Sequence, residues 1–286
     1  MKDSDISRRA FVKNTSLGMM LIALHPESCF AYDNHPKNIA AVNLSKFDLI
    51  KNIRLLTSTS LDKMKAFYVD KLGFSIESQE DAEITFIAGV STITFIKINP
   101  NLGNPWYHFA FNIPENKLLR SRRWLLERTD IIPTPKRARD PKFPDDVRHF
   151  RNWNAHSIFF WDPAGNLLEF IARHDLKNGT EGEFTSNDIL NVSEIAFVVD
   201  DQQGESEKLH DIFGLDVYPK NSNFWWAMGD EKGLLLCIPK RLWGENTDTP
   251  KRFKIFKTEA TIVGLDNKTY SFSHFPYQVQ MTKRNI

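Results

Sequence analysis

The chain has 286 residues, of which 12% are aromatic and 26% are charged, and its formal net charge is +1. This length is sufficient for one large domain or two small ones, and the composition is typical of a globular chain and excludes a wholly disordered one. A net charge so close to zero excludes a broad electrostatic attraction to nucleic acid or to anionic lipid.

The N-terminus has the three parts of an export signal. Residues 7–13 (SRRAFVK) are basic, residues 15–24 (TSLGMMLIAL) are apolar, and small residues follow. The paired Arg8 and Arg9 resemble the twin-arginine export signal. The apolar stretch is too short to span a bilayer, so we expect no stable membrane insertion. Residues 1–31 are therefore predicted to be a signal peptide that directs the protein to the periplasm or otherwise out of the cytoplasm.

After a predicted linker at 32–48, hydrophobic periodicity and turn signals predict alternating strands and helices. The predicted strands are 49–59, 83–88, 91–98, 107–114, 156–161, 167–173 and 193–201, with a hairpin at 225–238, and the predicted helices are 61–74, 115–129 and 207–215. The connection at 133–152 is rich in proline and basic residues and is long for a compact domain. It is either a lid that brings Arg148, Arg151 or Trp153 to a substrate or a solvated surface loop.

One strand pattern recurs along the chain. IRLLTST, HFAFNIP and EIAFVVD occupy one register, starting at Ile53, His108 and Glu194. A repeated supersecondary unit is indicated, consisting of a strand, a helix and three more strands. The predicted fold class is therefore α+β with repeated βαβββ units, and a shorter fourth unit is expected within 254–281.

The stretch FFWDPAGNLLEFIAR (159–173) predicts a β-hairpin with a carboxylate in an apolar setting. Asp162, Pro163 and Gly165 are typical of a tight turn that pairs Glu169 with Phe159 across the two strands. A buried carboxylate is costly unless it is paired or bound to a cation. Glu169 is therefore a cation ligand, an ion-pair partner of Arg173, or a residue of a frayed strand end that reaches water.

The unit order, the segment AFYVDKLGF at 66–74, HFAF at 108–111 and FWDPAGNLLEF at 160–170 resemble the vicinal oxygen chelate (VOC) superfamily. That superfamily includes glyoxalase I, bleomycin resistance proteins and extradiol dioxygenases. The resemblance covers roughly residues 50–240 and implies curved mixed sheets around a cleft. It also implies a paired βαβββ domain at 49–175, followed at 188–286 by a third unit and a truncated fourth.

The resemblance implies a divalent metal held by His108 and Glu169, with iron, manganese, zinc and nickel all suited to such ligands. Glu194 stands at the ligand position of the third unit, and it contributes only if unit three packs across unit two. In the first unit this position holds Ile53, which cannot bind a metal, and Thr94 replaces a carboxylate. The metal is therefore either held by fewer family ligands or absent.

The implied function is that of a metal-dependent enzyme, dioxygenase-like or glyoxalase/lyase-like, acting on a small oxygen-bearing substrate. Proton transfer would fall to Glu169, or to His149 or His156, either of which could also be a substituted ligand. The expected lining residues are Ser157, Phe159, Trp161 and Trp106. Phe159 replaces the tyrosine of the ring-cleaving relatives, which argues against their usual mechanism. The alternatives are a metal-free binding protein of the bleomycin-resistance type, and a homodimer in which two chains complete one site.

Overall fold

The computed structural model describes residues 47–220, 222, 226–240 and 255–284. The predicted signal peptide at 1–31 and nearly all of the predicted linker lie outside these residues, and both stay predictions. Within the described ranges, no helix is long and apolar enough to cross a membrane.

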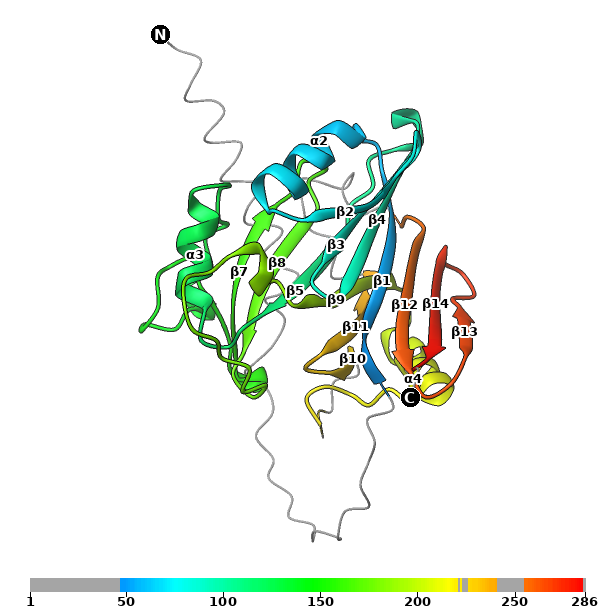
Figure 1. Ribbon diagram of the computed structural model, residues 1–286. Coiled ribbons are helices and arrows are strands. Elements are labelled where there is room, and N and C mark those ends of the chain that lie inside the picture. Colours follow the sequence, from blue (N-terminus) through cyan, green and yellow to red (C-terminus); the bar gives the residue numbers. More distant parts are fainter. Residues whose placement is uncertain (1–46, 221, 223–225, 241–254, 285–286) are drawn as a thin grey trace, which may run out of the picture.

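Strands from the two ends of the described chain share the first sheet, which we call sheet A (Figure 1). Its order is β13-β14-β12-β1-β4-β3-β2. Unit one supplies β1 (Phe47–Thr57), α2 (Leu61–Lys65) with the π-helical turn Ala66–Lys71, β2 (Ser75–Gln79), β3 (Glu83–Ala88) and β4 (Ser91–Lys97). The C-terminal segment supplies β12 (Thr258–Gly264), β13 (Lys268–Ser271) and β14 (Tyr277–Lys283).

The middle of the chain forms the second sheet, sheet B, with the order β10-β11-β9-β5-β8-β7-β6. Unit two supplies β5 (His108–Ile113), α3 (Leu118–Leu126), β6 (Arg148–Phe150), β7 (Ala155–Trp161) and β8 (Leu167–Arg173). Unit three supplies β9 (Asn191–Val199), α4 (Gln202–Phe213), β10 (Ala227–Asp230) and β11 (Gly233–Pro239). Short 3-10 turns at Pro100–Leu102, Lys136–Ala138, Arg151–Trp153 and Ser186–Asp188 complete the elements.

The last strand of each unit runs parallel to its first strand: β4 to β1, β8 to β5, β11 to β9 and β14 to β12. Two units then join through their antiparallel first strands, β1 with β12 and β5 with β9. Units one and two have the βαβββ arrangement predicted from the sequence, whereas unit three has two strands after its helix among the described residues. The predicted fourth unit is present as three strands, with no helix among its described residues.

The pairing of the units differs from the grouping expected at 49–175. Unit two shares its sheet with unit three, and unit one shares its sheet with the C-terminal strands. Any first strand offers the same backbone hydrogen-bonding edge, so the local sequence does not select its partner. The selection comes from distant contacts: Val90 N, in the β3–β4 turn, donates to Leu190 O at 2.9 Å, which fixes unit one against the start of β9.

The turn at 162–166 forms as its sequence predicts. Gly165 takes a φ of 80°, the left-handed conformation that glycine adopts without strain. The hairpin register places Glu169 directly opposite Phe159 and Ser157 opposite Ile171, which confirms the predicted pairing. Glu169 is therefore held in the middle of β8 and not at a frayed end.

The side chain of Asp162 links this turn to unit one. Its Oδ1 accepts hydrogen bonds from the backbone N of Ala164 and Asn166, and its Oδ2 accepts one from the hydroxyl of Tyr68 at 2.9 Å. Tyr68 lies in the π-helical turn and is fully buried among aromatic rings that include Phe86. Burial raises the pKa of Asp162 to about 6, although these hydrogen bonds favour the carboxylate.

The main hydrophobic core lies on the helix-covered faces of both sheets. It includes Phe109 and Phe111 on β5 and Phe170 on β8, with Trp124 of α3 packed against Phe170. Because side chains alternate along a strand, the neighbouring residues of β5 and β8 point to the opposite face of sheet B. That opposite face carries the buried polar residues described next.

Candidate metal centre

Three ionisable side chains converge on the face of sheet B that is not covered by helices. His108 begins β5, Glu169 lies in β8 and Glu194 lies in β9, and all three are at most 5% exposed. The His108 Nε2 atom lies 3.6 Å from Glu169 Oε2 and 4.0 Å from Glu194 Oε2. All three candidate ligand atoms are within 4.8 Å of one another. The described part of one chain thus contributes every member of this cluster.

The tautomer of His108 is set by the backbone. Its Nδ1 lies 3.1 Å from the carbonyl oxygen of Leu167, and because a carbonyl only accepts, Nδ1 carries the proton. Burial lowers the pKa of His108 to about 4, so the ring is neutral near pH 7. The lone pair on Nε2 then points at two carboxylate groups. A hydrogen bond from the other ring nitrogen to the backbone is how metal-binding histidines are commonly oriented.

The two carboxylates destabilise each other's charged form. Burial, followed by the charge of Glu194, raises the pKa of Glu169 well above its ordinary value, while Ser157 and two arginines act in the opposite direction. Burial raises the pKa of Glu194 to about 7 despite its ion pair with Arg173. The Oε1 atom of Glu169 is buried, and the hydroxyl of Ser157 lies near this carboxylate and favours its charged form.

Arg173 belongs to the site, but its ion-pair partner differs from the one that the sequence suggested. Its guanidinium is fully buried, donates to the carboxylate of Glu194 and donates through Nε to Asn112 Oδ1 at 3.2 Å. It also lies over the rings of Trp153 and Tyr218, at 5.2 and 5.6 Å from their centroids. The expected ion pair with Glu169 is therefore made with Glu194. The sequence identified Arg173 as a candidate ion-pair partner, but the pairing of β5 with β9 determines which glutamate it contacts.

The donor set fits a divalent cation. One neutral imidazole nitrogen and two carboxylate oxygens converge, with the three candidate ligand atoms within 4.8 Å of one another. Ligand bonds of about 2.0–2.2 Å place neighbouring ligand atoms roughly 3–3.5 Å apart, so the observed separations need only a small contraction. A cation held by these atoms would relieve the repulsion between the two carboxylates.

The fourth position of the repeat is apolar. Glu169 pairs with Ala110, two residues after His108, and the corresponding partner of Ala196 on β11 is Leu236, which is buried. The site therefore offers three protein ligands and leaves the remaining coordination positions to other molecules.

Sheet A holds no equivalent ligand set among its described residues. Ile53 is fully buried in the main core, as its chemistry requires. On the other face of β1, Asn52 donates to Thr92 Oγ1 at 2.8 Å, and Thr94 shares a hydrogen bond with Thr85 at 2.9 Å. These side chains satisfy one another and present no carboxylate or imidazole.

The four predicted lining residues lie at different distances from the cluster. Ser157 faces Glu169 and lowers its pKa, and the ring of Phe159 is centred 6.2 Å from that of His108. Trp106 lines a pocket with His108, whereas Trp161 packs against the cluster that contains Phe159.

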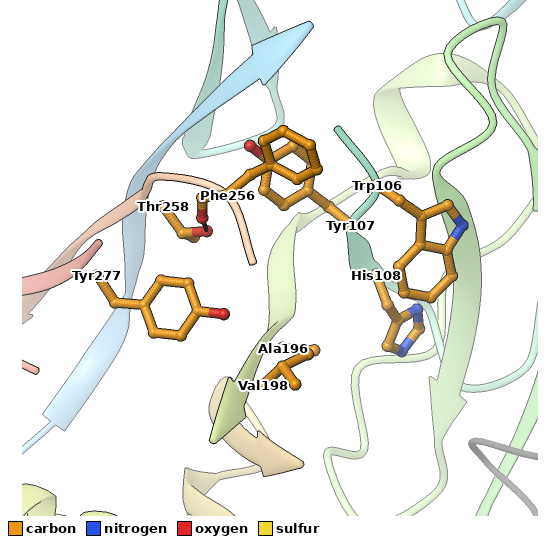
Figure 2. A pocket seen from close by; sticks show the side chains of 8 residues that line it. All are labelled: Trp106, Tyr107, His108, Ala196, Val198, Phe256, Thr258 and Tyr277. Atoms are coloured by element: carbon orange, nitrogen blue, oxygen red, sulfur yellow. Dashed lines mark hydrogen bonds between the residues drawn. The ribbon is translucent and has the colours of Figure 1, made fainter. Parts of the chain in front are cut away.

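Figure 2 shows that the pocket beside His108 lies between β5 and β9 on one side and the C-terminal strands on the other. Its remaining lining residues are Tyr107, Ala196, Val198, Phe256, Thr258 and Tyr277.

His149 and His156 are not brought to Glu169. His156 pairs with Ala172 and points to the face opposite that of Ser157, while His149 pairs with His156 across β6 and β7. The predicted role of either histidine in proton transfer at Glu169 therefore has no geometric support. The 133–152 connection does deliver Arg148 to the Glu169 side, where its charge lowers the pKa of Glu169.

No family model matches the sequence, and no curated protein matches it either. Among solved structures, a candidate dioxygenase from Bacillus subtilis subsp. subtilis str. 168 is 13% identical with a TM-score of 0.52, covering 84% of this chain and 86% of that chain. A single-residue mutant of glyoxalase I from Zea mays is 11% identical with a TM-score of 0.50, covering 82% and 93%. At these identities the likeness shows the fold alone: the chain has a glyoxalase/dioxygenase-like fold.

Proposed function

We propose that the protein is a metal-dependent enzyme of the VOC type that acts on a small substrate bearing adjacent oxygen atoms. The observation that carries this proposal is the convergence of His108 Nε2, Glu169 Oε2 and Glu194 Oε2, which all lie within 4.8 Å of one another and are buried. These three residues would hold iron, manganese, zinc or nickel. Such an ion, when bound, stabilises negative charge that develops on substrate oxygens.

Glu169 is the residue best suited to move a proton. A cation at Oε2 would favour the carboxylate form, and Oε1 could then accept a proton from a substrate carbon or oxygen and later return it. Phe159 and Trp106 exclude water from the same region. These features favour proton transfer of the lyase or isomerase kind, and oxygen-dependent chemistry is the second option because Phe159 supplies no hydroxyl.

The lining of the pocket beside His108 indicates the polarity of a substrate that would enter it. Trp106, Ala196 and Val198 supply apolar surface, and Thr258 and Tyr277 contribute hydroxyl groups from the C-terminal strands. The hydroxyl of Thr258 donates to the carbonyl of Phe256 at 3.1 Å, so it can still accept a hydrogen bond from a ligand. A small molecule with one apolar end and one oxygen-rich end fits this lining.

A metal-free binding protein is the second candidate, and one observation favours it. Arg173 already compensates the charge of Glu194, and the apolar Leu236 takes the fourth ligand position. In that case Glu169 would stay protonated, and the pocket would bind its ligand without converting it.

The deciding experiment measures metal content in protein purified without chelator, together with the His108→Ala variant. We expect the variant to lose one equivalent of transition metal per chain relative to wild type. Glu83→Gln is the matched control, since Glu83 is a partly buried glutamate of sheet A that pairs with Arg54 at 2.8 Å. Identical metal content in wild type and His108→Ala, before and after metal titration, would favour the alternative of a metal-free binding protein. Lyase and ring-cleavage assays would follow a positive result.

We also propose export by the twin-arginine route, which the Ser7–Lys13 segment supports. Replacing Arg8 and Arg9 together by lysine should retain the full-length protein in the cytoplasm. Periplasmic recovery of the doubly substituted protein at the wild-type level would contradict this proposal.

A further inference from the structure

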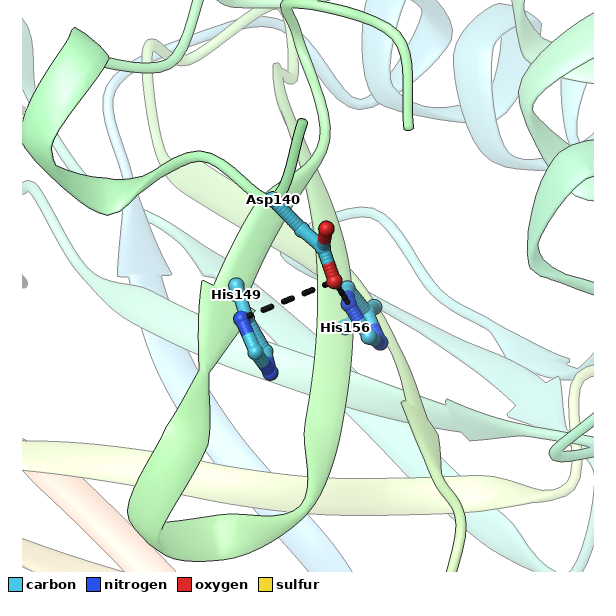
Figure 3. Close-up of side chains that lie close together, drawn as sticks. All are labelled: Asp140, His149 and His156. Carbon is cyan, nitrogen blue, oxygen red and sulfur yellow. Dashed lines mark hydrogen bonds and ion pairs between the residues drawn. The ribbon is translucent and has the colours of Figure 1, made fainter. Parts of the chain in front are cut away.

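A second group of potential ligands lies on the opposite face of sheet B. Asp140 comes from the long connection before β6, His149 from β6 and His156 from β7, and one ligand atom from each lies within 4.8 Å of the others. Asp140 Oδ2 is 3.3 Å from His156 Nε2 and 3.8 Å from His149 Nδ1. Figure 3 shows both rings side by side with the carboxylate directed at each.

Hydrogen bonds behind His156 connect it through His174 to Glu115. Glu115 Oε2 lies 3.2 Å from His174 Nδ1, and His174 Nε2 lies 2.8 Å from His156 Nδ1. Asp140 Oδ2 lies 3.3 Å from His156 Nε2, so carboxylates, which only accept, stand at both ends of this chain of contacts. Two neutral rings carry two N–H groups for three contacts, so a further proton, or a cation at Asp140, completes the chain.

The surroundings hold this arrangement in place. The rings of His149 and His156 are stacked with centroids 4.4 Å apart and an interplanar angle of 5°. Phe143 covers the other face of His156 at a centroid distance of 4.1 Å. Two imidazolium ions stacked in this way would repel each other. Two neutral rings can share one cation once one of them rotates, because parallel rings direct their nitrogen lone pairs along parallel lines. His149 is 22% exposed at its side chain, which leaves a route from solvent.

We propose that Asp140, His149 and His156 form a second metal site that binds a borderline transition-metal ion such as Zn²⁺. Two imidazole nitrogens and one carboxylate oxygen are suited to this ion, and its fourth position is left to water. His174 and Glu115 orient His156 through its other nitrogen, as hydrogen-bonded partners of metal-binding histidines do. This site is separate from the His108 cluster, because its ligands lie on the other face of the sheet.

The ion would join three segments of the chain. It would tie the 133–152 connection, through Asp140, to the edge strand β6 and to β7. Arg148 precedes His149 and therefore points to the other face of β6, toward Glu169, whose pKa it lowers. A metal at the second site would therefore hold β6, the strand that positions Arg148 beside Glu169 of the first site.

The test uses Zn²⁺ titration of chelator-treated full-length protein by calorimetry, with ring-nitrogen chemical shifts of the histidines as a second readout. The His108→Ala/Glu169→Gln variant removes the first site and should still bind one equivalent. His149→Gln/His156→Gln in that background should bind none, while His210→Ala, on α4, should change nothing. Glu115→Gln should weaken binding by roughly 10–100-fold, because it removes the group that orients His174.

The two sites fail independently. If wild type binds one equivalent and only His149→Gln/His156→Gln removes it, this second site stands and the proposed function falls. If His108→Ala/Glu169→Gln binds no Zn²⁺, or if binding survives His149→Gln/His156→Gln, the second site is refuted. A His156 ring found protonated at both nitrogens at pH 7 with Zn²⁺ present would also refute it, since Asp140 would then be an ion-pair partner.

Discussion

Replacing Glu169 by glutamine should stabilise the metal-free protein and weaken metal binding at the first site. Glutamine has the same shape but carries no charge, so the repulsion from Glu194 disappears. Its amide can donate a hydrogen bond to His108 Nε2, which lies 3.6 Å from the present Oε2 atom. At a pH high enough to ionise Glu169 in the metal-free protein, this hydrogen bond and the removal of a buried charge are expected to add roughly 1–3 kcal/mol to the free energy of unfolding.

The effect on the metal-bound protein has the opposite sign. Removing one ligand of three should cost about 3 kcal/mol of binding free energy, which corresponds to a roughly 100-fold weaker affinity. At a metal concentration about 100 times the wild-type dissociation constant, wild type gains about 2.7 kcal/mol from metal and the variant only about 0.4 kcal/mol. For a chain of this size the wild-type melting temperature should rise by roughly 5–10 °C, and that of the variant by about 1 °C.

Thermal unfolding of both proteins, with chelator and with metal, measures these changes. The Glu83→Gln control should shift its melting temperature equally with and without metal, because its partner Arg54 lies in sheet A. All three proteins should carry the His149→Gln/His156→Gln substitutions, so that the second site contributes nothing to the comparison. A metal-free Glu169→Gln protein that is less stable than wild type would contradict the repulsion between Glu169 and Glu194. Glu169 is not a metal ligand if metal raises the melting temperatures of wild type and Glu169→Gln by the same amount.

Three further changes test the framework around the site. The pKa of Asp162 is raised to about 6 in the folded protein, so the stabilisation by its protonated form is complete below pH 4 and is lost as the pH rises through 6. Over this range the free energy of unfolding should decrease by about 3 kcal/mol in wild type and not in Asp162→Asn, as unfolding titrations would measure. Arg173→Met leaves Glu194 buried without its ion-pair partner and should lower the free energy of unfolding by roughly 3–5 kcal/mol, measured with denaturant. A decrease under about 1 kcal/mol would contradict a stabilising ion pair. Gly89→Ala should cost roughly 3 kcal/mol or more, because φ is +61° and a Cβ atom would lie 2.0 Å from Leu190 O; a variant with wild-type stability would exclude this contact between the sheets.

Features set by local chemistry could be predicted from the sequence. The residues Asp162, Pro163 and Gly165 fix a tight turn, and that turn fixes the register that places Glu169 opposite Phe159. Alternation along the strand then determines which face carries Glu169. His108 was expected beside Glu169 because of the resemblance to the VOC superfamily, in which the first and last strands of a unit supply ligands, and these two residues open and close the same unit.

Features set by distant contacts could not be predicted. Glu194 was expected to contribute only if unit three packed across unit two, and the pairing of β5 with β9 is what brings it near His108. No short stretch encodes that pairing. The partner of Arg173 depends on it too, as does the role of His174, which has no informative neighbours in sequence but lies 2.8 Å from His156. Asp140 likewise belongs to a connection whose path was undetermined.

The two proposed sites of sheet B should be coupled through β6. A metal held by Asp140 and His149 would fix this strand and keep the guanidinium of Arg148 near Glu169, where its positive charge opposes a second cation. Coupling between binding sites is reciprocal, so each metal should weaken the other. We therefore expect His149→Gln to tighten metal binding at the first site by about 3–10-fold, and Arg148→Met to abolish the dependence between the sites. Calorimetric titrations that gave the same first-site affinity in wild type and His149→Gln would show that the two faces of the sheet act independently.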